Sequence, residues 1–213
     1  MKEIIVSHPL VKHKLTMLRD VNTDSPKFRA LVDELVYLLA FEATRDVETE
    51  QIEITTPIQK TMGTVLKSTP TPVIVPILRA GLGLLQGMSQ VLPTAEIGFL
   101  GMRRDEDTLE IETYANRLPK SLVGRTVFLL DPMLATGGST IAAINFLKEL
   151  GAKTIVSVNL LAAPEGLKRV SEEFGDSIDL TVVVAGVDEK LNENGYIVPG
   201  LGDAGDRLYG VVD

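Results

Sequence analysis

Two kinds of hydrophobic spacing alternate along this chain, and together they predict a mainly parallel α/β fold. Ser25 and Pro26 favour a helix start, because a hydroxyl can cap a helix and proline suits its first turn. Apolar residues then recur at helical spacing up to Leu39. Strand patterns follow at 50–56, 73–78, 95–101, 108–114, 126–130, 154–161 and 179–185, with further helices at about 80–92, at 139–150 and from about 164.

Buried strands that alternate with helices indicate a parallel sheet covered by helices on both faces. Residues 95–114 differ, because two strands flank a charged tip there, and we expect a protruding β-hairpin arm. A glycine-rich segment near the end of the chain predicts a C-terminal loop. The sequence contains no internal repeat, low-complexity tract or linker, so residues 1–213 are expected to form a single domain.

The charge balance and the missing cysteines narrow the function. With 29 acidic and 21 basic residues, the net charge of −8 argues against a nucleic-acid binder, which needs surplus Lys and Arg to neutralise phosphates. The absence of cysteine excludes disulfides and thiolate nucleophiles. With only two histidines as well, the composition argues against a metal site built on nitrogen and sulfur ligands. No apolar run suits a signal peptide or a membrane span, so we expect a cytoplasmic protein without a membrane partner.

Residues 127–140 carry the strongest chemical pattern. An apolar strand delivers Asp131 to its carboxyl end, and Ala135-Thr136-Gly137-Gly138-Ser139 then leads into a helix. Glycines let the backbone approach a ligand closely, and free N–H groups at a helix start attract phosphate. Thr136, Ser139 and Thr140 can add hydroxyl donors, while the Asp131 carboxylate suits two adjacent ribose hydroxyls. A Walker loop is excluded because no lysine follows the glycines.

Two further segments contain arginines suited to phosphate. In Pro76-Ile-Leu-Arg-Ala-Gly81, Arg79 follows a buried strand, from which its guanidinium can form paired hydrogen bonds to phosphate oxygens. On its own, such an arginine is more often a surface residue. The charged segment at 101–110 is likewise, on its own, more often a solvated hairpin tip.

The segment 195–206 is dense in glycine and contains Asp203 and Asp206. Residues 200–205 spell G-x-G-x-x-G, but the long helix and the acidic residue about twenty positions later that a dinucleotide site requires are missing. We therefore interpret the segment as a ligand-binding loop of another kind.

These segments resemble the phosphoribosyltransferases. The family signature for phosphoribosyl diphosphate (PRPP) is an apolar strand, an acidic pair and a T-G-x-[ST] loop, which Asp131 and residues 136–139 fit, although Pro132 stands at the second acidic position. Three segments resemble the uracil phosphoribosyltransferase branch in particular: V-P-I-L-R-A-G at 75–81, R-D-x-x-T-L at 104–109 and Y-I-V-P-G-L-G-D-A-G-D at 196–206.

The resemblance implies the type I phosphoribosyltransferase fold and the transfer of the phosphoribosyl group of PRPP to uracil, giving UMP and diphosphate. It implies catalytic roles for Arg79, Arg104 and Asp131, with Arg104 preferred over the adjacent Arg103. The residues implied to bind PRPP are Arg79, Arg104, Asp131, Pro132, Met133, Leu134, Ala135, Thr136, Gly137, Gly138, Ser139 and Asp203. Those implied to bind uracil are Ile197, Gly202, Asp203 and Ala204, with the C-terminal loop as the base-binding loop.

The resemblance also implies Mg²⁺ carried with PRPP rather than held by a protein metal site, GTP as an effector, and a homo-oligomer (dimer or tetramer). Three alternatives stay open at this point. One is a phosphoribosyltransferase for adenine, hypoxanthine or orotate, against which the C-terminal loop argues. The others are a regulatory RNA-binding protein on the same scaffold, which would need a basic face, and a binding-only relative without turnover.

Overall fold

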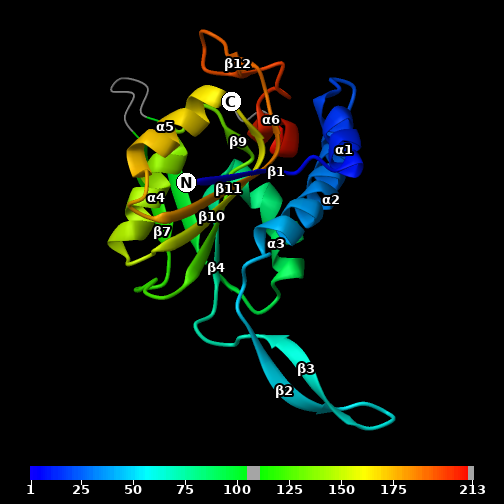
Figure 1. Ribbon diagram of the computed structural model, residues 1–213. Coiled ribbons are helices and arrows are strands. Elements are labelled where there is room, and N and C mark those ends of the chain that lie inside the picture. Colours follow the sequence, from blue (N-terminus) through cyan, green and yellow to red (C-terminus); the bar gives the residue numbers. More distant parts are fainter. Residues whose placement is uncertain (105–110, 211–213) are drawn as a thin grey trace.

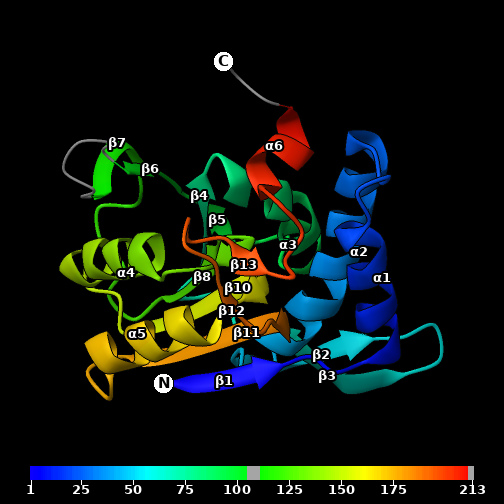
Figure 2. The same ribbon diagram turned by 90° about the horizontal axis from the view of Figure 1, so that it is seen from above.

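Helices cover both faces of one sheet in the computed structural model, which describes residues 1–104 and 111–210 and leaves out the side chains of residues 103, 104, 111 and 112 (Figures 1 and 2). Its described strands are β1 (Lys2–Ile5), β4 (Val73–Leu78), β5 (Glu96–Ile97), β6 (Phe99–Arg104), β7 (Ile111–Arg117), β8 (Thr126–Leu130), β9 (Met133–Leu134), β10 (Thr154–Ala162) and β11 (Asp179–Val187). They run in the order β1-β11-β10-β8-β4-β6-β7, with β5 beside β4 and β9 beside β10. Every pair is parallel except β6 with β7, which confirms the predicted sheet.

The helices divide into two layers. On one face lie α1 (Pro9–Arg19), α2 (Ser25–Ala43), α3 (Leu85–Val91) and α6 (Ala204–Tyr209); on the other lie α4 (Gly138–Glu149) and α5 (Pro164–Phe174) (Figure 2). A short 3₁₀ helix, η1 (Ala80–Leu84), follows β4. Successive strand residues point to opposite faces, so Ile74 and Phe128 pack under the first layer while Val73 and Val127 pack under the second.

The first turn of α2 differs from the prediction by one residue. Asp24, not Ser25, caps the helix, because its carboxylate accepts a hydrogen bond from the N–H of Lys27 at 2.9 Å. Ser25 and Pro26 form the first helical positions instead.

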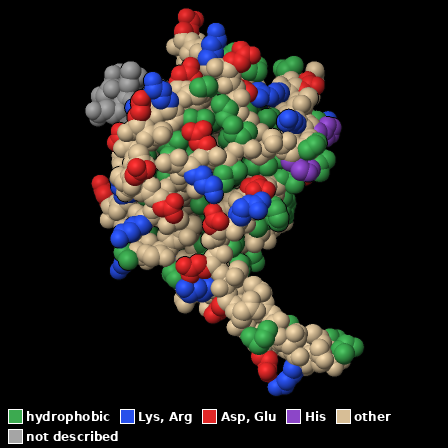
Figure 3. All heavy atoms as spheres, viewed as in Figure 1, with side chains coloured by type: hydrophobic (Ala, Val, Ile, Leu, Met, Phe, Trp, Pro, Cys, Tyr) green, Lys and Arg blue, Asp and Glu red, His purple; other side chains and the backbone are tan. Residues whose placement is uncertain are grey.

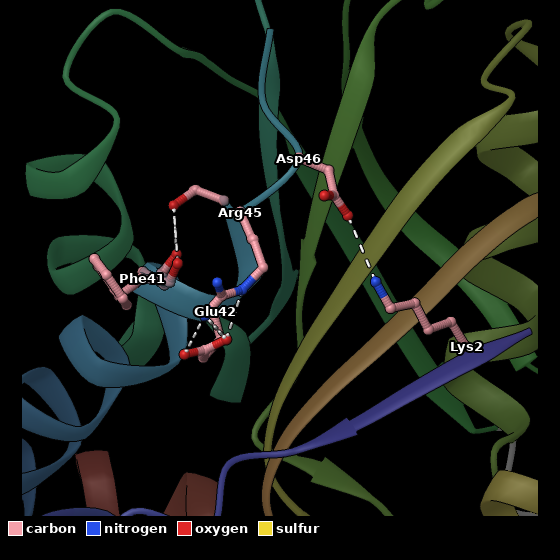
Figure 4. A network of polar contacts seen from close by, with 7 residues as sticks. Lys2, Phe41, Glu42, Arg45 and Asp46 are labelled. Atoms are coloured by element: carbon pink, nitrogen blue, oxygen red, sulfur yellow. Dashed lines mark hydrogen bonds and ion pairs between the residues drawn. The ribbon is translucent and has the colours of Figure 1, made fainter.

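The other end of α2 carries exposed ion pairs (Figure 4). Arg45 pairs with both carboxylate oxygens of Glu42, and Lys2 of β1 lies 3.6 Å from Asp46. Exposed pairs of this kind stabilise a fold little, so the buried apolar layers are the main support of α2.

A second hairpin, β2 (Thr49–Thr55) with β3 (Lys60–Leu66), stands clear of the body (Figure 1). The sequence predicted its first strand but not its second. It placed the protruding arm at 95–114 instead, where β6 and β7 do form an antiparallel pair at the sheet edge. Hydrophobic side chains are exposed on the β2–β3 arm, among them Ile58 (89% exposed) and Met62 (59%) (Figure 3).

Several short elements were not predicted: β1, α1, β9, α6, and the small antiparallel pair β12 (Lys190–Leu191) with β13 (Ile197–Val198). Among the described residues, no helix has both the length and the apolar character that crossing a bilayer would require.

Candidate active site

Loops that follow the central parallel strands surround a cleft of about 930 Å³, on the side where ligands commonly bind in α/β sheets. The cleft brings together predicted residues from three of the four motif segments, those at 75–81, 127–140 and 195–206. Its lining residues are Arg79, Met133, Ala135, Asn194, Gly195, Tyr196, Ile197, Gly202, Asp203 and Ala204. Asp131 and residues 136–139 adjoin it through Met133 and Ala135 but are not among the lining residues.

The loop between β9 and α4 ends in a helix start suited to an anion. Gly137 precedes the helix at φ +78°, a backbone conformation that favours glycine, and as the N-cap residue it has no side chain to cap the helix. The N–H of Gly138 makes only a long hydrogen bond, 3.5 Å, to the hydroxyl of Thr136, so the first turn of α4 can still donate to a phosphate. Ser139 and Thr136 are half-buried, whereas Thr140 is 2% exposed. The expected role of the buried Thr140 hydroxyl as a ligand donor stays a prediction.

A close contact with α5 holds this loop in place. A Cβ at Gly166 would lie 2.2 Å from the carbonyl oxygen of Ala135, so only glycine permits this approach. Gly166 could not be recognised from the sequence, because a glycine inside a helical pattern gives no sign of what packs against it.

Asp131 directly follows β8, and its environment favours the protonated carboxyl group. Burial raises the pKa of Asp131 to about 7, while the N–H of Met133, 3.5 Å from Oδ1, acts weakly in the opposite direction. A pKa close to neutrality makes the charge of this carboxylate sensitive to pH and to any hydroxyl that binds it.

A buried polar pair fixes the backbone of Asp131. Asn159 donates from Nδ2 to the carbonyl oxygen of Asp131 at 2.6 Å, and Ser157 donates from Oγ to Oδ1 of Asn159 at 2.9 Å. Both side chains are fully buried in β10. Ser157 and Asn159 were not predicted from the sequence, although two polar residues at alternate positions of an apolar strand were an available signal.

Pro132 and Leu134 face inward, and their contact with PRPP stays a prediction. The carbonyl of Pro132 accepts hydrogen bonds from the N–H groups of Leu160 and Leu161, and that of Leu134 accepts one from Ala163. The side chain of Leu134 is fully buried. These two residues therefore anchor the loop to β10.

Arg79 lies at the start of η1, exposed and facing the cleft. Two residues later, a Cβ at Gly81 would lie 2.3 Å from the carbonyl oxygen of Leu130. Gly81 thus allows the Arg79 turn to pack directly on the end of β8, next to Asp131.

Arg104 ends β6, and its side chain lies outside the described part of the chain. The same holds for Arg103, and residues 105–110 of the predicted hairpin motif are not described at all. The preference for Arg104 over Arg103 stays a prediction.

The C-terminal loop presents its backbone to the cleft. Ile197 and Ala204 are buried in the core at 6% and 3% exposure, while Gly202 and Asp203 between them are exposed. Asp203 also caps α6 by accepting a hydrogen bond from the N–H of Asp206 at 2.9 Å. The loop is therefore anchored at both ends and accessible in the middle.

A tight turn just before this loop also reaches the cleft and was missed from the sequence. Oδ1 of Asn192 accepts hydrogen bonds from the N–H groups of Asn194 and Tyr196, at 3.0 and 2.9 Å. This turn places Asn194, Gly195 and Tyr196 on the cleft wall. The Asn-Glu-Asn-Gly sequence at 192–195 is typical of such turns and could have revealed it.

The architecture defines the class of the protein. Adenine phosphoribosyltransferase from Thermoanaerobacter pseudethanolicus shares the fold, with a TM-score of 0.54 at 12% identity over 83% of this chain and 99% of that one. The AQ2163 protein from Aquifex aeolicus is similar throughout, with a TM-score of 0.90 at 45% identity over 98% of each chain. The fold is that of the type I phosphoribosyltransferases.

Sequence comparison specifies the family. The family model described as uracil phosphoribosyltransferase matches residues 5–211. Proteins of that name from Beutenbergia cavernae and Kineococcus radiotolerans are 63% and 64% identical to this chain, and each match covers 100% of both chains. The chain belongs to the uracil phosphoribosyltransferase family.

Proposed function

We propose that this chain transfers the phosphoribosyl group of PRPP to uracil, giving UMP and diphosphate. The observation that carries the proposal is the shared cleft, into which Arg79, the loop before α4 and the C-terminal loop all project. A reaction between a phosphorylated sugar and a small neutral base needs a phosphate subsite, here Arg79 and the loop before α4, beside a base subsite, here the C-terminal loop. Membership of the family supports the same reaction.

The 5′-phosphate would lie at the N-terminus of α4, where uncapped N–H groups and the hydroxyls of Thr136 and Ser139 can donate hydrogen bonds. The Asp131 carboxylate would accept hydrogen bonds from the ribose hydroxyls. Each contact holds the sugar, and together they leave its anomeric carbon exposed to the base.

Arg79 and Arg104 would neutralise the departing diphosphate, since a guanidinium can bond two phosphate oxygens at once. Asp131 is followed by Pro132 rather than a second acid, and no three His, Cys, Asp or Glu side chains in the described ranges gather as a metal site would need. This donor set fits Mg²⁺ carried on the oxygens of PRPP, where the ion would add further neutralising charge.

Uracil would be read by the backbone of the exposed stretch at Gly202 and Asp203, between the buried Ile197 and Ala204. Its recognition edge presents two carbonyl acceptors and one N–H donor, whereas cytosine replaces one acceptor with an amino donor. A backbone N–H would then face that donor unpaired, at a cost of about 1–3 kcal/mol.

The reaction would be a displacement through an oxocarbenium-like state. The bond from the anomeric carbon to diphosphate would break with its electron pair leaving on diphosphate, the bond to N1 of uracil would form, and the N1 proton would be released to solvent. No covalent side-chain nucleophile takes part. Positioning and electrostatic stabilisation of the leaving group together can supply on the order of 10 kcal/mol.

The expected homo-oligomer, GTP effector and cytoplasmic location are also proposals. The exposed apolar side chains of the β2–β3 arm support a contact between copies of the chain. Light scattering after size-exclusion chromatography would measure the oligomeric state. Initial rates with and without GTP would test the effector, and cell fractionation would test the location.

The reaction is tested by incubating the protein with PRPP and Mg²⁺ and offering uracil, cytosine, adenine, hypoxanthine and orotate in turn. UMP and diphosphate should appear with uracil alone; turnover of another base without uracil would contradict the proposal. Arg79→Ala should slow the reaction strongly, because a contact to the leaving group is lost. Arg45→Ala, which removes an exposed arginine at the end of α2, is the matched control and should leave the rate unchanged.

A further inference from the structure

A single ion pair holds the backbone of the C-terminal loop. Arg19, the last residue of α1, donates from Nη1 and Nη2 to the two carboxylate oxygens of Asp188 at 2.7 and 2.5 Å. The same Nη1 donates to the carbonyl oxygen of Gly200 at 2.8 Å, and Asp188 accepts a hydrogen bond from the N–H of Gly200 at 2.9 Å. Both polar backbone groups of Gly200 are therefore bound by one pair of side chains.

The pair is built for rigidity. The side chain of Asp188 is only 6% exposed, and that of Arg19 is 26% exposed. Burial raises the pKa of Asp188, but hydrogen bonds from Arg19 and Gly200 outweigh this effect and hold the pKa below its ordinary value. Gly200 itself has φ +63°, and a Cβ there would lie 2.2 Å from the carbonyl oxygen of Ile197, so the turn tolerates little change.

A second arginine, Arg207, connects the other end of the loop to the segment between α1 and α2. Arg207 of α6 lies with its guanidinium carbon 4.4 Å from the centre of the Phe28 ring. Its N–H groups donate to four backbone carbonyls, those of Leu18, Asp20, Thr23 and Leu201. The C-terminal loop is thus held by Arg19, which extends from α1, and by Arg207, which extends from α6 to the segment between α1 and α2.

The side chains of Arg19, Asp188 and Arg207 do not line the cleft, whereas Gly202 and Asp203, which follow Gly200 after Leu201, do. Recognition of a base by backbone groups works only when those groups are held in position. We propose that Arg19 and Asp188 are positioning residues, which set the affinity for uracil by fixing the loop without touching the base. This inference rests on the proposed role of the loop in uracil binding.

The test compares the full-length protein with Asp188→Asn and Arg19→Lys. Asparagine keeps the shape but loses the charge, and lysine cannot bond both carboxylate oxygens and the Gly200 carbonyl together. Each variant should lower kcat/KM for uracil between about ten- and a hundred-fold, with kcat/KM for PRPP at saturating uracil changed less than about twofold. Lysine, which keeps the charge, should have the smaller effect.

Arg125→Lys is the matched control. Arg125 also bonds one carbonyl and one carboxylate, those of Thr71 at 2.6 Å and Glu96 at 3.0 Å, but it lies before β8, away from the cleft. The Arg125→Lys variant should lose stability as Arg19→Lys does, while its kcat/KM for uracil should stay unchanged. An equal loss for both substrates in Asp188→Asn, or the same loss for uracil in Arg125→Lys, would overturn the proposal.

Amide hydrogen exchange without substrates separates this inference from the proposed function. Exchange in residues 197–204 should be faster in Asp188→Asn than in the unmodified protein. Unchanged exchange would show that the ion pair does not hold the loop, and would overturn the inference. Faster exchange with an unchanged kcat/KM for uracil would show that the held loop does not bind uracil, and would overturn the inference together with the proposed role of the loop.

Discussion

On the proposed assignment of Asp131 to the ribose hydroxyls, PRPP binding should depend on pH in a way that one substitution removes. Burial raises this pKa to about 7, and accepting hydrogen bonds from two ribose hydroxyls requires the ionised carboxylate. Binding should therefore draw a proton off Asp131 whenever the pH lies below that value. Asp131→Asn keeps the size of the side chain and has no proton to lose.

The size of the effect follows from simple titration. With a pKa of about 7, the carboxylate is roughly nine-tenths ionised at pH 8 and roughly one-tenth ionised at pH 6. The dissociation constant for PRPP should therefore rise about tenfold from pH 8 to pH 6, which corresponds to about 1.4 kcal/mol. At pH 6, binding should release close to one proton from Asp131.

Isothermal titration calorimetry in two buffers of different ionisation enthalpy measures both quantities. The phosphate groups of PRPP titrate near pH 6 and affect both proteins equally, so the informative quantity is the difference between the unmodified protein and Asp131→Asn. The same pH dependence and proton release in both would refute the assignment of Asp131 to the ribose.

Stability gives an independent readout with a defined sign. The folded pKa of Asp131 lies above its ordinary value of 3.8, so its stabilising contribution is present below about pH 4 and is lost as the pH rises to about 7. Asp131→Asn should therefore exceed the unmodified protein in free energy of unfolding at pH 8, by up to about 4 kcal/mol, and match it near pH 4. Urea denaturation at both pH values measures this difference.

Three further substitutions test the supports of the site. Asn159→Leu should lower the free energy of unfolding by about 1–3 kcal/mol in urea denaturation and raise KM for PRPP, because it leaves a buried carbonyl unpaired; unchanged stability would contradict this. Gly166→Ala should raise KM for PRPP at least about tenfold by pushing on the loop before α4, whereas Lys168→Ala on the exposed side of α5 should not; equal values would refute the contact. Gly81→Ala should displace the Arg79 turn and lower kcat at least about tenfold in steady-state assays, and an unchanged kcat would show that the turn is not held there.

Elements with a local sequence pattern could be predicted, whereas contacts between residues far apart in the chain could not. The apolar strands at 73–78 and 126–130 and the glycine-rich loop after Asp131 were found because their patterns are local. The strand β3 was missed because its apolar residues, Met62, Val65 and Leu66, do not alternate, whereas Ile52 and Ile54 of β2 do. Arg19 and Asp188 are 169 positions apart, and no spacing rule connects them before the chain folds.

The acidic charge of the chain restricts how it could bind a ligand rich in phosphate. A net charge of −8 gives no general attraction for anions, and at physiological ionic strength screening limits such forces to about 8 Å. On the proposed function, binding would therefore come from groups in direct contact: the first N–H groups of α4 and the guanidinium of Arg79. The residues that support these groups differ from those that support the C-terminal loop. Gly166 and Asn159 support the proposed phosphate and ribose subsites, whereas Arg19 and Asp188 support the proposed uracil subsite. Because these supports share no residue, affinity for PRPP and affinity for uracil can change independently, and single substitutions can separate them.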